Sequence, residues 1–231
     1  MAESHDFSLD WGAHALLELL CFYGNDFKTV LDVGGGKGEH TRFLKLFGKQ
    51  ASIIDLHEEA DYQGDFQSYE FPHKFDAIFC SHVLEHQRNV GMFIERLYDV
   101  LADDGILAIA VPCHSRQIML GGHITNWNAG LLVYNLILGG FDCSEARIFQ
   151  GVDLNLVMRK KPARGGDILT SSAWTLPTEL SQYFPFPVEQ GGNCEITQVN
   201  WRSDYCLPAI GRPVSLHIRG QAIGDATVDC I

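Results

Sequence analysis

The sequence predicts an α/β protein with a doubly wound, mostly parallel sheet. Short apolar runs alternate with segments of helical periodicity up to Lys160. The runs are apolar throughout and do not alternate with polar residues, which is typical of parallel strands buried on both faces. Strands and helices that alternate in this way pack as helices on both sides of one sheet.

The elements of the first 80 residues follow from local periodicity. Leucines cluster at helical spacing over 13–22, and the same spacing recurs over 39–47. Three short apolar runs are expected to be strands, at 29–33, 51–55 and 75–80. The first of these runs ends in a glycine-rich loop, which places that loop between a strand and a helix.

The pattern continues beyond residue 80. Apolar residues at steps of three and four predict an amphipathic helix over 90–101, which Asp103-Asp104-Gly105 is expected to stop. A fully apolar strand, 106–111, follows. The remaining expected elements are a helix over 127–138 and a closing antiparallel pair, 146–149 and 154–158.

Composition excludes several classes of protein. The 231 residues carry a formal charge of -12, whereas a large nucleic-acid footprint needs clustered positive charge. No apolar run approaches the roughly 20 residues that span a bilayer. The N-terminus lacks the basic start and apolar core of a signal peptide. Seven scattered cysteines indicate reduced thiols, so we expect a cytoplasmic protein with no membrane span and no nucleic-acid partner.

The glycine loop, LDVGGGKGEH at 31–40, does not fit a triphosphate-binding loop. That loop requires Gly-x4-Gly-Lys followed by Ser or Thr, whose hydroxyl holds magnesium. Here Lys37 is followed by Gly38, so the hydroxyl ligand is missing.

A dinucleotide-binding loop is also disfavoured. Its Gly-x-Gly-x-x-Gly pattern needs a third glycine, and this place holds Glu39 or Thr41, counting from Gly34 or Gly36. An acid at the start of a helix also repels a pyrophosphate there.

An acid at a strand tip, Asp32, stands beside glycines 34, 36 and 38. This arrangement suits a ligand that presents an ammonium and a carboxylate together, as S-adenosylmethionine does, although a glycine-rich turn is often only a tight connection. Asp55 ends the second strand, where it can accept hydrogen bonds from ribose hydroxyls or act as a helix cap. Asp65 can face an adenine amine or be a solvated turn residue.

Five motifs in order resemble those of class I S-adenosylmethionine-dependent methyltransferases: VLDVGGGKGEHTRFL, SIIDLHE, QGDFQSY, KFDAIFCSHVLEH and VLADDGILAIAVP. They extend over about residues 28–112, and the likeness is to small stand-alone enzymes that act on metabolites, quinones, sugars and glycans. Residues 121–141 are similar to a segment that precedes the last two strands of some of these enzymes. The resemblance implies a Rossmann-like sheet of seven strands.

The resemblance also implies roles for the residues within these motifs. The loop residues would hold the methionine part of the cofactor, Asp55 the ribose, and Asp65 with Phe66 the adenine. Residues just past a later strand would line the cleft near the sulfonium. The expected cofactor-binding residues are Asp32, Gly34, Gly36, Gly38, Asp55, Asp65, Phe66, Ser81 and His82.

Methyl transfer is a direct displacement that depends on alignment, and an alcohol acceptor also benefits from a general base near neutral pKa. We expect His123 to be that base and His114 to be the second candidate, although each can equally be a structural histidine. His86, within Leu84-Glu85-His86, can be structural. No ligand spacing among Glu85 and histidines 86, 114 and 123 requires a metal, and we expect none.

The expected function is therefore methyl transfer from S-adenosylmethionine to a hydroxyl of a small-molecule or sugar-like acceptor. N-methylation and a non-catalytic, cofactor-binding partner protein remain alternatives. The acidic balance and the lack of an Asn-Pro-Pro-Tyr-type motif disfavour nucleic-acid methylation. We expect a core at 1–161 and an ordered extension at 162–231, with Val214, Leu216 and Ile218 on an amphipathic strand. The extension would cover the acceptor cleft or form a subunit contact, as in a homodimer.

Overall fold

The computed structural model describes residues 3–9, 11–57, 59–113, 120–163, 177–201, 214–220 and 227–230. For residues 3–8, 214–220 and 227–230 it describes the backbone alone. His114 lies outside the described residues, as does Trp174 in the C-terminal extension.

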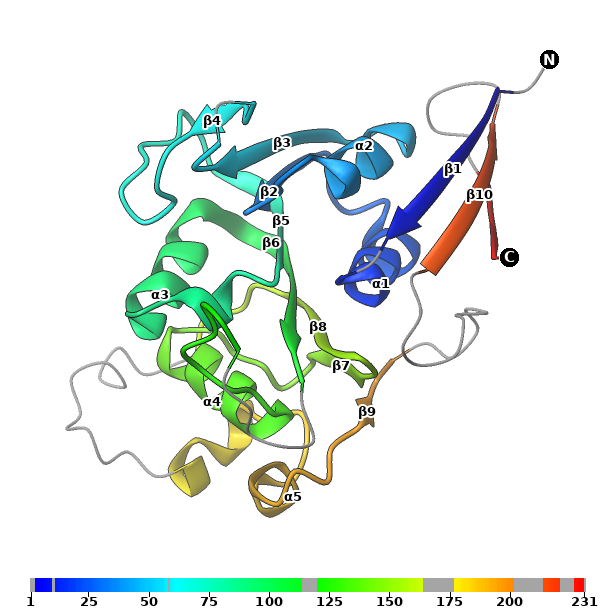
Figure 1. Ribbon diagram of the computed structural model, residues 1–231. Helices are drawn as coiled ribbons and strands as arrows, with labels where there is room; N and C mark the ends of the chain where they lie inside the picture. The colour runs from blue at the N-terminus through cyan, green and yellow to red at the C-terminus, as the bar shows by residue number, and fades with distance from the viewer. Residues whose placement is uncertain are drawn as a thin grey trace.

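The principal sheet has eight strands in the order β4-β3-β2-β5-β6-β8-β7-β9 (Figure 1). The first five of these are parallel to one another, and the last three pair antiparallel. The doubly wound, mostly parallel sheet is confirmed, and β9 adds a further strand from the C-terminal extension. The bounds are β2 Thr29–Val33, β3 Gln50–Asp55, β4 Tyr62–Gln63, β5 Phe75–Ser81, β6 Leu101–Pro112, β7 Arg147–Gln150, β8 Asp153–Arg159 and β9 Gln198–Val199.

Helices cover both faces of this sheet because its central strands are apolar on both sides. Helices α1 (Ala13–Tyr23) and α2 (Glu39–Leu46) share one apolar cluster with Val30 and Phe79. Helices α3 (Val90–Val100) and α4 (Ala129–Leu138) share the other with Leu31 and Ile78. Burying one such side chain contributes about 1.5–3 kcal/mol. Because successive side chains of a strand point to opposite faces of the sheet, each strand stabilises the helices on both sides.

The junction between α3 and β6 differs from the sequence prediction. The helix ends at Val100, and Leu101 is already extended and pairs with Phe75. Asp103-Asp104-Gly105 therefore lies within β6, at an irregularity where Asp104 has a φ of 60°, and the predicted start of this strand at residue 106 is wrong. The buried Lys160 ammonium donates to the Leu101 carbonyl at 2.9 Å and so satisfies a polar group at this junction.

Besides the pairing of β9 with β7, the described part of the extension packs against the core in two further places. The short helices η2 (Pro177–Tyr183) and α5 (Val188–Gly192) lie against α4, where Leu180 and Phe184 join its apolar cluster. Farther along, β10 (Val214–Gly220) matches the expected amphipathic strand and pairs with β1 (Glu3–Leu9) and β11 (Thr227–Cys230). These three form a separate antiparallel sheet that contains the first and the last strands of the described chain (Figure 1). Within the described ranges, no helix is long and apolar enough to cross a membrane.

Candidate active site

A cavity of about 360 Å³ lies at the carboxyl ends of β2 and β3, where doubly wound folds bind ligands. Five separate stretches of the chain form it: the end of β2, the end of β3, the segment after β4, the residues that flank η1 (Leu84–His86), and α3. We call it the strand-end cavity. Its lining is Val33, Gly34, Ile54, Asp55, Leu56, Gly64, Asp65, Phe66, Val83, Gln87 and Phe93.

Gly34 brings the glycine loop close to the cavity wall. Its φ of 71° lies in the left-handed region, and its N–H donates to the Ile54 carbonyl at 2.9 Å. A Cβ at this position would lie 2.4 Å from Cγ2 of Val83, which is too close for any side chain. Only glycine fits both the backbone conformation and the contact.

The Asp55 carboxylate lies at the cavity edge with both oxygens engaged by backbone amides. Oδ2 accepts from the Gly36 N–H at 3.0 Å, and Oδ1 accepts from the His57 N–H at 3.2 Å. The side chain is 14% exposed, so it still faces the cavity. Each carboxylate oxygen has a second lone pair, which leaves capacity for hydroxyl donors from a ligand.

Three other residues of the glycine motif, Asp32, Gly36 and Gly38, are not in the cavity lining. The buried Asp32 accepts a hydrogen bond from the Thr41 hydroxyl at 2.7 Å. Burial raises the pKa of Asp32, while the His40 ring and the Thr41 hydroxyl act in the opposite direction. Gly38, with a φ of 75°, is the residue before α2. Asp32 and Gly38 therefore support the turn that carries Gly34.

The segment after β4 places Asp65 and Phe66, two of the expected cofactor-binding residues, in the lining. Asp65 Oδ1 accepts from the Gln67 N–H at 3.0 Å, which fixes a tight turn. Phe66 is mostly buried against Phe93, with ring centroids 5.2 Å apart. The cavity therefore has an apolar wall beside a carboxylate.

Ser81 and His82 are not part of this lining. His82 has a φ of 54° and lies between two carboxylates: its Nε2–H donates to Asp153 Oδ1 at 3.1 Å, and its Nδ1 is 3.3 Å from Glu85 Oε1. Burial lowers the pKa of His82, but the contacts with Asp153 and Glu85 outweigh burial and raise the pKa to about 9. His82 is therefore a cation at neutral pH and a poor general base.

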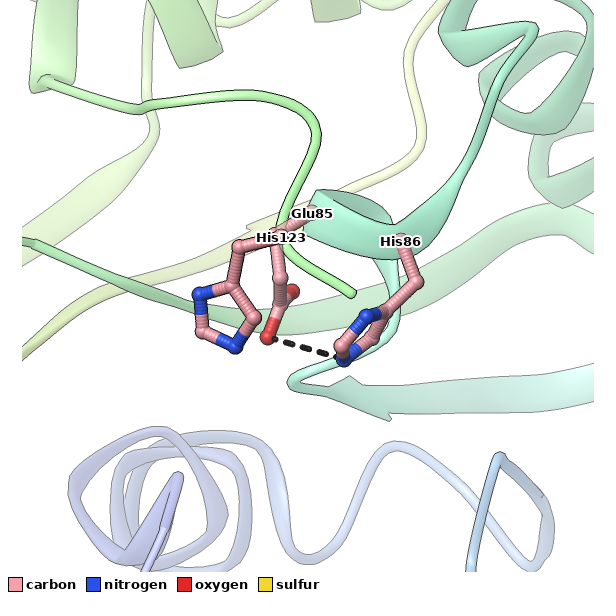
Figure 2. Close-up of side chains that lie close together, drawn as sticks. All are labelled: Glu85, His86 and His123. Atoms are coloured by element: carbon pink, nitrogen blue, oxygen red, sulfur yellow. Dashed lines mark ion pairs between the residues drawn. The ribbon is translucent and has the colours of Figure 1, made fainter. Parts of the chain in front are cut away.

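Beyond His82, Glu85 meets two further histidines, His86 and His123 (Figure 2). We call these three residues the Glu85 cluster. The rings of His86 and His123 are nearly perpendicular, with centroids 5.0 Å apart. Nε2 of His86 is 3.7 Å from Oε1 of Glu85. His123, the first candidate base, is thus part of a cluster with a buried carboxylate and does not stand alone.

Sequence reasoning missed several residues of both sites. The strand-end cavity is also lined by Val83, Gln87 and Phe93. They were missed because Val83 and Phe93 are apolar and Gln87 lies just beyond the motif that ends at His86. Asp153 was missed because it belongs to β8, about 70 residues after His82. The order of strands β5, β6 and β8 brings the two together, and no local pattern encodes it.

The geometry defines the class of protein: this is a doubly wound α/β protein with a cavity at the carboxyl ends of its first parallel strands. Residues 11–144 then match the model of a family described as "Methyltransferase domain", which is more than half of the chain. The chain belongs to this methyltransferase family.

Known proteins of this kind are similar over parts of the chain. (S)-coclaurine N-methyltransferase of Papaver somniferum is 26% identical over 112 residues, which is 38% of this chain and 31% of that protein. The chain spans about a third of the length of the curated relatives it matches.

Two solved structures illustrate the fold. One is 1,6-didemethyltoxoflavin-N1-methyltransferase of Burkholderia thailandensis, with S-adenosylhomocysteine bound, at a TM-score of 0.54 and 20% identity over 64% of this chain and 76% of that one. The other is mitomycin 7-O-methyltransferase MmcR, at a TM-score of 0.51 and 16% identity over 65% of this chain and 54% of that one. At such identities these likenesses show the fold alone.

Proposed function

We propose that this chain transfers a methyl group from S-adenosylmethionine to a hydroxyl of a small-molecule or sugar-like acceptor. The observation that carries the proposal is the strand-end cavity, in which a glycine loop, a strand-tip carboxylate and an apolar wall meet in a member of a methyltransferase family. The cavity volume of about 360 Å³ is in the range of small-molecule sites.

The methyl donor is S-adenosylmethionine, and the cavity offers a place for each of its parts. The glycine loop takes the methionine part, and Gly34 lines the cavity. Gly36 holds Asp55 through its N–H, and Asp32 and Gly38 support the turn. The Asp55 carboxylate accepts the ribose hydroxyls through its remaining lone pairs. Asp65 faces the adenine amine, and Phe66 packs on the ring. The bound S-adenosylhomocysteine of the Burkholderia enzyme supports the same donor here.

The chemical step requires alignment and the removal of one proton. The acceptor oxygen attacks the methyl carbon, the carbon–sulfur bond breaks, and its electron pair remains on sulfur, which becomes neutral. His123 is the first candidate to take the hydroxyl proton, because it lies beside residues that adjoin the strand-end cavity. His114 is the second candidate.

N-methylation is the second candidate function. The names of the Papaver relative and of the Burkholderia enzyme both specify nitrogen as the acceptor atom. A neutral amine attacks without prior loss of a proton, so it has less need of the Glu85 cluster. The MmcR structure shows that oxygen acceptors also occur on this fold.

We further propose that residues 1–161 are the catalytic core and that residues 162–231 close its acceptor side or contact another subunit. The support is a second cavity, of about 320 Å³, between α4 and the extension. It is lined mainly by apolar side chains and glycine backbone, including Leu131, Phe184, Val188 and Gly191.

The acceptor can be tested with labelled S-adenosylmethionine and a panel of hydroxyl and amine acceptors matched in carbon skeleton. We expect label on oxygen, located by fragmentation of the product in a mass spectrometer. Transfer to amines alone would replace the O-methylation proposal by its alternative. Transfer to neither, with intact donor binding, would favour a non-catalytic cofactor-binding protein.

A further inference from the structure

Glu85, His86 and His123 bring three metal-binding side chains together from two segments. Glu85 and His86 lie on η1, and His123 lies on the loop before α4 (Figure 2). One ligand atom from each residue lies within 4.8 Å of the others. Two imidazoles and one carboxylate form a ligand set that suits a borderline-soft divalent ion such as Zn²⁺.

The Glu85 carboxylate is buried and incompletely satisfied. Its side chain is fully shielded from solvent, and neither oxygen makes a hydrogen bond to the described residues. His82 Nδ1 lies 3.3 Å and His86 Nε2 lies 3.7 Å from its Oε1. Buried charged groups are normally hydrogen-bonded, paired at close range or bound to a metal. The printed approaches of His82 and His86 are both to Oε1, so Oε2 is still available to a cation.

His86 is held in the tautomer that a metal ligand needs. Its Nδ1–H donates to the Gly122 carbonyl at 2.8 Å, which leaves the Nε2 lone pair directed toward Glu85. Metal-binding histidines usually donate their other N–H to a backbone carbonyl in this way. Gly122 has a φ of 82°, and a Cβ there would lie 3.2 Å from Nδ1, so glycine permits the approach.

The surroundings of the cluster are negative overall. Asp153 and Glu85 carry two negative charges around the single imidazolium of His82. Asp153 also accepts from the Gly12 N–H at 2.8 Å, which fixes its position. Asp153 therefore orients His82, and His82 in turn contacts the Glu85 carboxylate, as supporting residues do around metal sites.

Backbone hydrogen bonds fasten the two segments together. The Glu85 carbonyl accepts from the Ile124 N–H at 2.9 Å and from the Thr125 N–H at 3.3 Å. Because these bonds join backbone atoms, they hold His123 beside η1 in any side-chain conformation. Ligand atoms around a tetrahedral zinc lie roughly 3.3 Å apart, so the side chains have to close by no more than about 1.5 Å.

We propose that Glu85, His86 and His123 bind a divalent transition-metal ion of the Zn²⁺ or Co²⁺ type. Three protein ligands leave a coordination position open, as in catalytic sites of this kind. His123 is then one of three ligands and no longer a lone base.

A metal here is well placed to act on the acceptor, a consequence that rests on the proposed function. Val83 and Gln87, on either side of the Glu85–His86 pair, line the strand-end cavity. A hydroxyl oxygen bound to the metal loses its proton to water more readily, and the resulting alkoxide attacks the methyl carbon. The inference narrows the acceptor to an oxygen compound that can bind the metal.

The metal site can be tested without donor or acceptor. The full, untagged protein is freed of metal with a chelator and titrated with Zn²⁺ by calorimetry and with Co²⁺ by visible absorption. We expect one ion per chain and a Co²⁺ spectrum of low coordination number. Mg²⁺ should compete poorly, because it prefers oxygen ligands and retains its waters.

Variants then assign the ligands. His86→Asn retains a donor for the Gly122 carbonyl while removing the Nε2 ligand, and His123→Ala removes the second imidazole. Each should weaken Zn²⁺ binding by about 10²-fold or more. Glu85→Gln should do the same, and if it fails to fold, the two histidine variants still decide, since neither His86 nor His123 is fully buried.

His73→Ala is the matched control, because His73 is exposed and lies outside the cluster. It should leave affinity and stoichiometry unchanged. The proposal is overturned if no ion binds, if His86→Asn and His123→Ala bind as tightly as the wild type, or if only Mg²⁺ binds.

Discussion

Asp55 at the edge of the strand-end cavity and Glu85 in the Glu85 cluster are carboxylates that differ in how they are satisfied. Both oxygens of Asp55 accept backbone N–H groups, whereas neither oxygen of Glu85 makes a hydrogen bond to the described residues. The cavity is therefore complete without its ligand, and the cluster is not. Removing a small-molecule ligand should therefore disturb the strand-end cavity little. Binding of a cation should strongly change the electrostatics of the Glu85 cluster.

The largest effect is expected in the cluster. His123→Ala should lower turnover by about 10²–10⁴-fold while leaving S-adenosylmethionine affinity nearly unchanged, because the cofactor contacts lie on earlier strands. Single-turnover methyl transfer to an identified acceptor is the measurement.

Companion variants sharpen this result. If His123 acts as a ligand, His86→Asn should cause a similar loss, whereas a lone base would leave His86→Asn near full rate. If His123→Ala retains full rate and His114→Ala does not, the base is His114. If neither histidine matters, alignment alone carries the catalysis.

The next effect concerns stability and pH in chelator-treated protein. The pKa of His82 is raised to about 9 from an ordinary value of 6.5, so its contribution is fully present below pH 6.5 and is lost as pH rises through about 9. The free energy of unfolding should fall by about 3 kcal/mol over this window. Denaturant titrations at several pH values measure it.

His82→Asn is the variant for this test, because asparagine tolerates the left-handed backbone of residue 82. We expect it to flatten the slope of stability against pH, while His73→Asn at an exposed site retains the slope. An unchanged slope in His82→Asn would mean that the imidazolium is not stabilised by Asp153 and Glu85.

In the strand-end cavity, Gly34→Ala and Gly36→Ala form a matched pair. Both positions have positive φ, but only a Cβ at residue 34 meets Val83, at 2.4 Å, whereas residue 36 has nothing within 4 Å. Overpacking costs about 1–3 kcal/mol, so Gly34→Ala should bind S-adenosylmethionine more weakly than Gly36→Ala by that amount. Equal affinities, measured by calorimetry on folded variants, would show that the Val83 contact does not shape the site.

Asp55→Ala should weaken S-adenosylmethionine binding by about 1–3 kcal/mol, the scale for losing hydrogen bonds to a charged group. Glu59→Ala is the control, since it removes one exposed negative charge nearby without touching the cavity. Calorimetry that finds unchanged affinity in folded Asp55→Ala would remove Asp55 from the ribose site.

Local patterns explain why one region was easier to foresee than the other. Strands β2, β3 and β5 and the cavity residues Gly34, Asp55 and Asp65 belong to short motifs whose order follows the parallel sheet. The Glu85 cluster brings together His86 and His123, which are 37 positions apart in the sequence. Hydrogen bonds to the carbonyls of Glu85 and Gly122 hold the two segments together, and nothing in the spacing indicates this contact. The start of β6 at Leu101 is accompanied by a tertiary contact from Lys160, which helical periodicity does not contain.

The most direct test of the central claim is a set of calorimetric titrations of the wild-type chain with S-adenosylmethionine, S-adenosylhomocysteine, NAD and ATP. The account predicts one site per chain for the first two ligands and no comparable binding of NAD or ATP. Binding of NAD or ATP in preference to S-adenosylmethionine would contradict it.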